Sequence, residues 1–341
     1  MSKVFFKKLD NFDEEVINSF TYEMLNQIIK ENNIKFTGTV PLKVHFGERG
    51  NDTFVKPNYY NGVKKYLSDN NVPTCYIETN VLYKSPRTKT DTHIEVAKEH
   101  GFTDLDIVIA DGSDDNMYNE IEVNLKNFKT CKIGSKFADY ENFIVLSHFK
   151  GHGLAGFGAA IKQLGMGFAS RGGKMHQHAT SVPSINEDLC IKCGACVRKC
   201  PVNAIRMEEV AVIDASICVG CASCTVVCPV NAIRNNWDQS NFHEKLAEYA
   251  YAAAKDKTNI YITYAFDITK ECDCNGKHME SVAPNIGVFV STDPLAIDQA
   301  TYDKFLEITN DSNMFETANL TLEHAKNIGL GSREYELIEI D

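Results

Sequence analysis

The sequence has no apolar run that approaches the roughly 18 residues needed for a membrane-spanning helix. Its first residues, MSKVFFKKLD, lack the long apolar segment of a signal peptide. Basic residues are in the minority, with 35 Lys and Arg against 46 Asp and Glu, which gives a formal net charge of -11. We therefore expect neither nucleic acid nor a membrane as a partner. Twelve cysteines without an export signal predict a reducing, cytoplasmic location.

Eight of the twelve cysteines form two runs with the same spacing, C-x2-C-x2-C-x3-C-P. This spacing, used twice, is typical of bacterial two-cluster ferredoxins, in which the fourth cysteine of each run ligates the other run's cluster. We therefore predict two [4Fe–4S] clusters. The first is assigned to Cys190, Cys193, Cys196 and Cys228, and the second to Cys218, Cys221, Cys224 and Cys200. Zinc ribbons are disfavoured, because they use widely separated CxxC pairs rather than a double run closed by prolines.

The two cysteine runs lie in an internal repeat with a period of 28 residues, in which CPVNAIR occurs identically at 200–206 and 228–234. On either side of the repeat, short apolar strands alternate with helical stretches, which predicts an α/β fold with a mixed or mainly parallel sheet. We therefore divide the chain into an α/β domain in two parts, residues 1–182 and 238–341, and an inserted α+β ferredoxin-like domain with two clusters, residues 183–237.

Hydrophobic periodicity predicts the individual elements. Strands are expected at 3–8, 40–46, 74–78, 105–110, 120–125, 130–133, 143–146, 259–266 and 286–291, and helices at 14–30, 59–67, 91–100 and 242–254. Asp293 is expected to cap a further helix that begins with Pro294.

Polar side chains follow several of the predicted strands, where an α/β fold binds its ligands. They are His45, Glu48, Asn51, Asn80, Asp111 and His148. Turns also favour Asn and Asp for conformational reasons. Each of these residues is therefore either a cofactor-binding residue or part of a turn.

The stretch between Phe143 and Asn186 contains no acidic residue, although about six would fall there by chance in a chain of this composition. It contains eight glycines between Gly151 and Gly173, and its basic side chains are Lys150, Lys162, Arg171 and Lys174. Glycines let backbone amides approach a ligand and the basic side chains supply charge, so the stretch suits a phosphate or carboxylate. The alternative is a loop that packs against anionic clusters.

Four of the ten histidines also fall in this stretch, namely His148, His152, His176 and His178. Such a concentration favours proton transfer or metal ligation over four independent structural roles. A C-x-C pair, Cys272 and Cys274, follows later in the chain. It is either a further metal-binding pair or two small buried residues.

Several motifs together resemble one family. They are KVHFGERGN, TNVLYK, IADG, LSHFKGHGLAGFGAAIKQLGMGFASRGGKMHQH, ECDC and DPLAIDQA, and they span nearly the whole chain. They resemble the family catalogued as domain of unknown function 362, in its form with a ferredoxin insertion. The resemblance implies architecture and redox character more than a particular reaction.

A second resemblance concerns the basic stretch alone. His152, Lys162 and His178 match the His-x9-Lys-x15-His spacing of lactate racemase, within a similar AGFGAAIK context. In that family the lysine tethers a nickel-pincer nucleotide and the last histidine binds the nickel. The resemblance implies a related site, although the residues flanking Lys162 differ.

Three functions follow from these patterns. In the first, the protein is an oxidoreductase whose clusters pass low-potential electrons from a redox partner protein to a cofactor or small anionic substrate, with Lys162, His152, His148 and His178 as catalytic residues. In the second, it is an electron-transfer protein that docks on another enzyme and has no substrate of its own. In the third, it is an isomerase with a tethered nickel-pincer cofactor. The sequence leaves the oligomeric state open.

Overall fold

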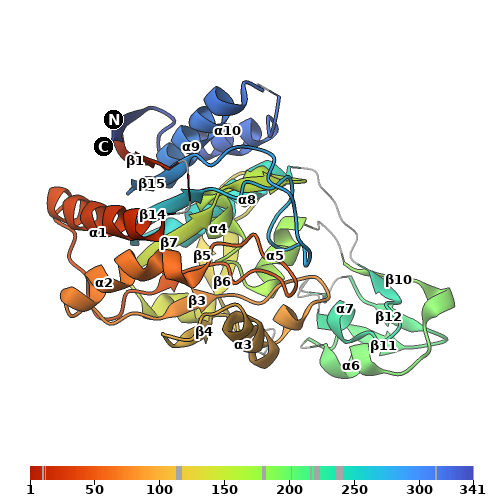
Figure 1. Ribbon diagram of the computed structural model, residues 1–341. Helices are drawn as coiled ribbons and strands as arrows, with labels where there is room; N and C mark the ends of the chain where they lie inside the picture. The colour runs from red at the N-terminus through yellow and green to blue at the C-terminus, as the bar shows by residue number, and fades with distance from the viewer. Residues whose placement is uncertain are drawn as a thin grey trace.

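The computed structural model describes residues 1–9, 11, 13–112, 117–178, 182–200, 202–215, 217–218, 223–234, 241–311 and 313–340. Its centre is an eight-stranded mixed sheet (Figure 1). The strand order is β16 (Tyr335–Glu339), β1 (Ser2–Lys8), β15 (Gly287–Ser291), β14 (Thr258–Ala265), β7 (Asn142–His148), β2 (Leu42–Lys43), β3 (Tyr76–Glu78) and β4 (Ile107–Ile109).

The sheet is mainly parallel, as predicted. Only the pairs β1–β15 and β14–β15 are antiparallel, whereas β7, β2, β3 and β4 form a parallel run that β14 extends. The predicted strand at 40–46 is wrong in length, because ladder pairing covers only Leu42–Lys43. From His45 onward the chain turns away and enters the loop that carries Glu48.

Helices cover both faces of the sheet, so the fold has three layers. Alternate side chains of β7 point to opposite faces, with Ile144 and Leu146 in one buried cluster and Phe143 and Val145 in the other. The first cluster packs under α1 (Glu14–Glu31), α2 (Asn61–Asp69) and α3 (Thr90–Glu99). The second packs under α4 (Ala160–Gly165), α8 (Phe242–Ala254), α9 (Pro294–Thr309) and α10 (Ala318–Asn327).

Helix starts follow from local capping. Asp13 accepts hydrogen bonds from the amides of Glu15 and Val16 at the start of α1. Asp293 accepts from the amides of Leu295 and Ala296, both at 2.9 Å, and Pro294 is the first residue of α9. The predicted cap of this helix is therefore confirmed.

The smaller elements lie around the sheet. They are the 3-10 turns η1 (Pro57–Tyr60), η2 (Pro86–Thr88), η3 (Ser135–Asp139) and η4 (Glu187–Leu189), and the hairpin of β5 (Tyr118–Glu122) and β6 (Thr130–Gly134). Among the described residues, no helix has both the length and the apolar character to cross a membrane.

The basic stretch contains regular structure that hydrophobic periodicity did not predict. It forms the hairpin of β8 (Lys150–His152) and β9 (Gly156–Gly158), followed by α4 and by α5 (Arg171–His178). Because α4 contacts β7, α8 and α9, the stretch is built into the three-layer body.

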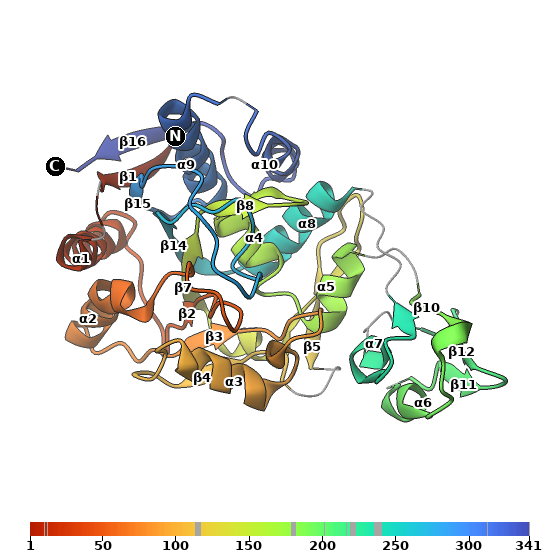
Figure 2. The same cartoon turned by 45° about the vertical axis from the view of Figure 1, so that its right-hand side comes forward.

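The described residues between 182 and 234 form a small, separate group of elements, which we call the cysteine-rich segment. The strand pairs are β10 (Ser184–Ile185) with β13 (Ile233–Arg234), and β11 (Ile205–Met207) with β12 (Ala211–Ile213). Two short helices, α6 (Ala195–Lys199) and α7 (Ser223–Val227), contact each other. Figures 1 and 2 both show this segment at one side of the molecule, with α7 on its side toward the sheet and helices.

Candidate functional site

A cavity of about 540 Å³ lies beyond the carboxyl ends of β2, β3 and β7. His45 follows β2, Glu78 and Thr79 stand at the end of β3, and His148 ends β7. The position is the one expected for a ligand site in a parallel α/β sheet. Its remaining lining residues include Tyr83, Arg87, Ser147, Lys150, His152, Lys162, Gln163, Lys174, His178 and Cys274.

The basic stretch supplies most of the polar wall. Of the residues predicted from it, the cavity lining includes His148, Lys150, His152, Lys162, Lys174 and His178. Arg171 and His176 lie elsewhere. Arg171 donates from Nη1 to the carbonyl of Thr88, and His176 contacts the Tyr249 hydroxyl through Nδ1 at 3.0 Å.

Lys150 and His148 share one buried carboxylate. Oδ2 of Asp273 lies 3.0 Å from Lys150 Nζ and 3.0 Å from His148 Nδ1. His148 Nε2 lies 2.7 Å from the carbonyl oxygen of Phe266, so both ring nitrogens face acceptors. Burial alone would raise the pKa of Asp273, but its two basic neighbours lower it well below its usual value. These contacts fix Lys150 at the cavity wall.

His152 and His178 are neutral side chains in this wall. The Nδ1 atom of His152 accepts hydrogen bonds from the amides of Leu154 and Ala155. Burial, with Lys162 nearby, lowers the pKa of His152 well below its usual value. The same causes lower the pKa of His178 to about 4, and its ring stacks on Phe242. The lysines therefore supply the positive charge, and the histidines are available to exchange protons or bind a metal.

Lys174 reaches the cavity from α5. Its Nζ donates to the Thr79 hydroxyl at 2.5 Å and to the Ala169 carbonyl at 2.8 Å. Burial lowers the pKa of Lys174 to about 8, because the carboxylates of Asp111 and Glu78 only partly offset the loss of water. Lys174 is therefore a cation whose charge changes close to neutral pH.

Arg87 is the main site residue that the sequence did not indicate. Its side chain is almost fully buried, and its Nε lies 3.2 Å from Oε2 of Glu48. The same oxygen accepts from the hydroxyls of Tyr83 and Ser85. Glu48, predicted to bind a cofactor, thus holds Arg87 in place and is itself outside the cavity lining. Nothing near Arg87 in the sequence marks it, since its partner is 39 residues away.

Asn80 and Asp111 were also predicted to bind a cofactor, but they bond to each other outside the cavity lining. Asp111 accepts from the amide of Asn80 at 2.8 Å and from the amide of Arg171 at 3.1 Å. The Asp111 carboxylate therefore joins the ends of two neighbouring strands to the start of α5. In this position both residues support the site rather than face a ligand.

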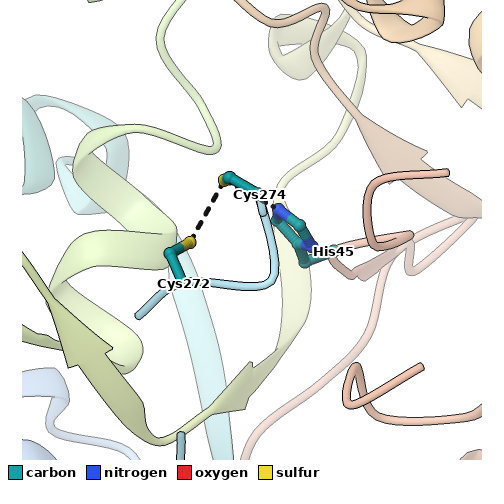
Figure 3. A group of neighbouring side chains, drawn as sticks. All are labelled: His45, Cys272 and Cys274. Atoms are coloured by element: carbon teal, nitrogen blue, oxygen red, sulfur yellow. Dashed lines mark hydrogen bonds between the residues drawn. The ribbon is translucent and has the colours of Figure 1, made fainter. Parts of the chain in front are cut away.

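The C-x-C pair meets His45 (Figure 3), and His45 and Cys274 both line the cavity. The sulfurs of Cys272 and Cys274 are 3.1 Å apart, and Cys274 Sγ lies 3.5 Å from His45 Nε2. Lys162 Nζ lies 3.6 Å from Cys272 Sγ. The hydrogen bond between the two cysteines, together with Lys162, lowers the pKa of Cys272, while the same hydrogen bond and burial raise the pKa of Cys274. The three side chains form a group able to hold a metal ion.

In the cysteine-rich segment, four cysteines line one small cavity. They are Cys190, Cys193 and Cys196 of the first run, with Cys228 of the second. The sulfurs of the two fourth cysteines accept equivalent backbone hydrogen bonds, Cys200 from Ala204 at 3.1 Å and Cys228 from Ala232 at 3.2 Å. The second predicted set falls partly on Cys221, which lies outside the described residues. No disulfide joins the cysteines that the structure describes.

Comparison with known proteins gives a family and one distant structure. The family model described as domain of unknown function (DUF362) matches residues 40–303, which confirms the resemblance noted from the motifs. A crystal structure of a protein from Thermotoga maritima, determined as a structural-genomics target, matches with 9% sequence identity and a TM-score of 0.43. The match covers 94% of this chain and 60% of that protein. No curated protein sequence matches.

Proposed function

The chain belongs to the DUF362 family, and from the residues of its site we propose that it is an iron–sulfur oxidoreductase that transfers electrons to an anionic substrate in the cavity. The observation that carries the proposal is the position of Cys228. It belongs to the second cysteine run, yet it lines the same small cavity as Cys190, Cys193 and Cys196 of the first. Exchange of the fourth ligand between runs is the arrangement of two-cluster ferredoxins.

The described cysteines of the cysteine-rich segment support the proposal of two [4Fe–4S] clusters. Thiols are the donors that such clusters require, and the amides of Ala204 and Ala232 already point at the sulfurs of Cys200 and Cys228. Hydrogen bonds of this kind tune cluster potentials. When bound, the clusters supply one-electron transfer. The pairing of β10 with β13 and of β11 with β12 is consistent with an inserted ferredoxin-like domain.

The large cavity suits a small anion. Lys150, Lys162, Lys174 and Arg87 line it, whereas Glu78 is the only acidic residue of its lining among the described residues. Glu78 is itself paired with buried Lys43, whose Nζ lies 2.9 Å away. We assign substrate binding to the lysines and Arg87, and proton transfer to the neutral His152 and His178, because reduction of a substrate commonly requires protons as well as electrons.

A second candidate is an isomerase with a tethered nickel-pincer cofactor. The observation that favours it is that His152, Lys162 and His178, the residues that match the lactate racemase spacing, all line the same cavity. This candidate predicts a mass adduct on Lys162 and activity that is independent of the oxidation state of the clusters. The oxidoreductase proposal predicts that the clusters change oxidation state as the substrate reacts.

The experiment is anaerobic purification of the full chain, followed by iron and sulfide analysis and reduction with dithionite. We expect about eight iron atoms per chain, and reoxidation of the clusters by small oxidised anions that slows when Lys162 is replaced by Met. Two results would overturn the proposal: zinc in place of iron, or reoxidation that is unaffected by Lys162→Met for every acceptor that wild type reduces. A docking protein without its own substrate would transfer electrons to a partner protein alone.

A further inference from the structure

Three potential metal ligands meet at the cavity wall, outside the cysteine runs and outside the basic stretch. One nitrogen of His45 and the sulfurs of Cys272 and Cys274 all lie within 4.8 Å of one another (Figure 3). His45 comes from the chain after β2, and the two cysteines come from the loop after β14. Two segments more than 200 residues apart in sequence therefore place three donors of soft or borderline character at one point.

The backbone around this group is built to hold it. The amide of Glu48 donates to the carbonyl of Asp273 at 2.9 Å, which ties the two loops together. Gly50 has a φ of +89°, and a Cβ there would lie 2.6 Å from the carbonyl oxygen of Gly276. The two loops can approach this closely only because glycine stands at the contact.

Asp273, between the two cysteines, is turned away from the group. Its carboxylate is occupied by His148 and Lys150, so it cannot serve as a ligand. The chain turns at this point, where the amide of Asn275 donates to the carbonyl of Cys272 at 2.8 Å, and the turn brings Cys272 and Cys274 together.

The ring of His45 is also oriented for ligation. The amide of Gly47 donates to Nδ1 at 3.0 Å, which leaves Nε2 toward Cys274. A metal ion on Nε2 would take the place of the proton that this tautomer carries there. His45 and Cys274 both line the cavity, so one side of the group is open to a ligand.

We propose that His45 Nε2, Cys272 Sγ and Cys274 Sγ bind one thiophilic divalent transition metal ion, with a coordination position left open toward the cavity. Two thiolates and an imidazole suit zinc and its neighbours in the first row, whereas magnesium and calcium require oxygen donors. Three protein ligands with one open position are typical of catalytic rather than structural zinc sites.

The surrounding charge is compatible with such an ion. Two thiolates would balance the charge of a divalent ion, so the nearby side chains of Lys162 and Arg87 would face a metal centre without net charge. Lys162, 3.6 Å from Cys272 Sγ, is placed to donate a hydrogen bond to a metal-bound thiolate. The Arg87 guanidinium, 3.5 Å from His45 Nε2, is held by Glu48. This metal site does not depend on the cysteine runs and would exist even if the proposed electron transfer were wrong.

The competing use of the same atoms is a dithiol that closes to a disulfide. The sulfurs of Cys272 and Cys274 are 3.1 Å apart. Tetrahedral coordination with metal–sulfur bonds of about 2.3 Å would separate them to about 3.8 Å. The two uses therefore differ in what each sulfur is bonded to: a metal ion in the first, and the other sulfur in the second.

The experiment uses the full chain with its iron content measured, treated anaerobically with a chelator and then given one equivalent of Zn²⁺. We expect one tightly bound zinc per chain, and a zinc-edge X-ray absorption spectrum with two sulfurs at about 2.3 Å and one imidazole nitrogen at about 2.0 Å. Cys274→Ser and His45→Ala should each weaken zinc binding at least about tenfold. Their iron content should match wild type, which shows that the variants fold.

The matched control is Cys75→Ser, since Cys75 is also buried but belongs to no group of three or more potential metal ligands among the described residues. It should bind zinc as wild type does. The proposal is overturned if wild type does not retain zinc, if the zinc has four sulfur neighbours and no nitrogen, or if Cys274→Ser binds zinc unchanged. A Cys272–Cys274 disulfide in the chelator-treated protein that persists in the presence of zinc would also overturn it, in favour of the dithiol.

Discussion

Lys150 Nζ lies 3.0 Å from Oδ2 of Asp273, and both side chains are almost completely withdrawn from water. The pair connects the basic stretch to the loop of the C-x-C motif, and His148 contacts the same carboxylate. This buried carboxylate is strongly coupled to the fold, because without it the buried Lys150 would lack its counter-charge.

Asp273→Asn should therefore destabilise the protein by about 3–5 kcal/mol at pH 7, because it leaves Lys150 buried without its counter-charge. The denaturant midpoint, measured anaerobically, is the readout. Asp52→Asn is the control, since Asp52 pairs with His278 on the surface, where both side chains are more than half exposed. It should change stability by less than about 1 kcal/mol. Equal changes in stability for the two substitutions would show that the buried pair stabilises the fold no more than the surface pair does.

Gly151→Ala tests how closely the β8–β9 hairpin approaches the loop before Cys272. A Cβ on Gly151 would lie 2.1 Å from the carbonyl oxygen of Lys270, a backbone atom that cannot rotate away. We expect a loss of about 1–3 kcal/mol in stability. Gly153→Ala, in the same hairpin, meets nothing within 4 Å and should be nearly neutral. A stable Gly151→Ala variant would mean that the two segments are farther apart.

The sequence predicted those parts of the fold and site that depend on local pattern. Short apolar runs located β7 and β14, and a capping aspartate followed by proline located the start of α9. His45 and His148 were identified because parallel strands end at one edge of the sheet, and both line the cavity. These inferences need only neighbouring residues and the general geometry of α/β sheets.

The remaining features depend on contacts between distant residues. Arg87 was missed because its counter-charge, Glu48, lies 39 residues away in the sequence and only the fold brings the two together. Asn80 and Asp111 were correctly placed at strand ends, but the sequence could not show that they bond to each other. Helices α4 and α5 were missed because glycines at 165, 167, 172 and 173 mask their periodicity. Tertiary packing therefore overrides weak local propensity there.

Anion binding in the cavity should weaken as the pH rises through about 8. Burial lowers the pKa of Lys174 to about 8, so this lysine is charged at pH 7 and largely neutral at pH 9. The charge of Lys174 stabilises a bound anion below pH 8 and is lost above it. At a distance of several ångströms, this loss should weaken anion binding by roughly 1 kcal/mol, or about fivefold in affinity. Sulfate is a suitable probe, because its own charge is constant over this range. Calorimetric titrations at pH 7 and pH 9 at constant ionic strength measure the difference.

Lys174→Met is the matched variant for this titration. It should bind sulfate more weakly than wild type at pH 7, and its affinity should change much less between pH 7 and pH 9. If the affinity of the variant changes between pH 7 and pH 9 as much as that of wild type, the pH dependence comes from another group.

Each proposed cluster should be held by cysteines of both runs. Cys228 lines the same small cavity as Cys190, although 38 positions separate them in sequence. Cys190→Ser and Cys228→Ser should therefore alter one and the same cluster, whereas Cys200→Ser should alter the other. Each variant should lose part or all of one cluster, down to about four iron atoms per chain. Electron paramagnetic resonance of the reduced variants then shows which cluster signal is retained.

The double variant Cys190→Ser/Cys228→Ser separates this arrangement from its alternative. If both cysteines ligate one cluster, the double variant should still hold about four iron atoms and show the same remaining signal as either single variant. If each run binds its own cluster, the double variant should lose both clusters. Cys75→Ser, which removes a buried thiol outside both runs, should retain the full iron content. The iron content of the double variant therefore reports whether the two runs share clusters, and not simply how many cysteines were removed.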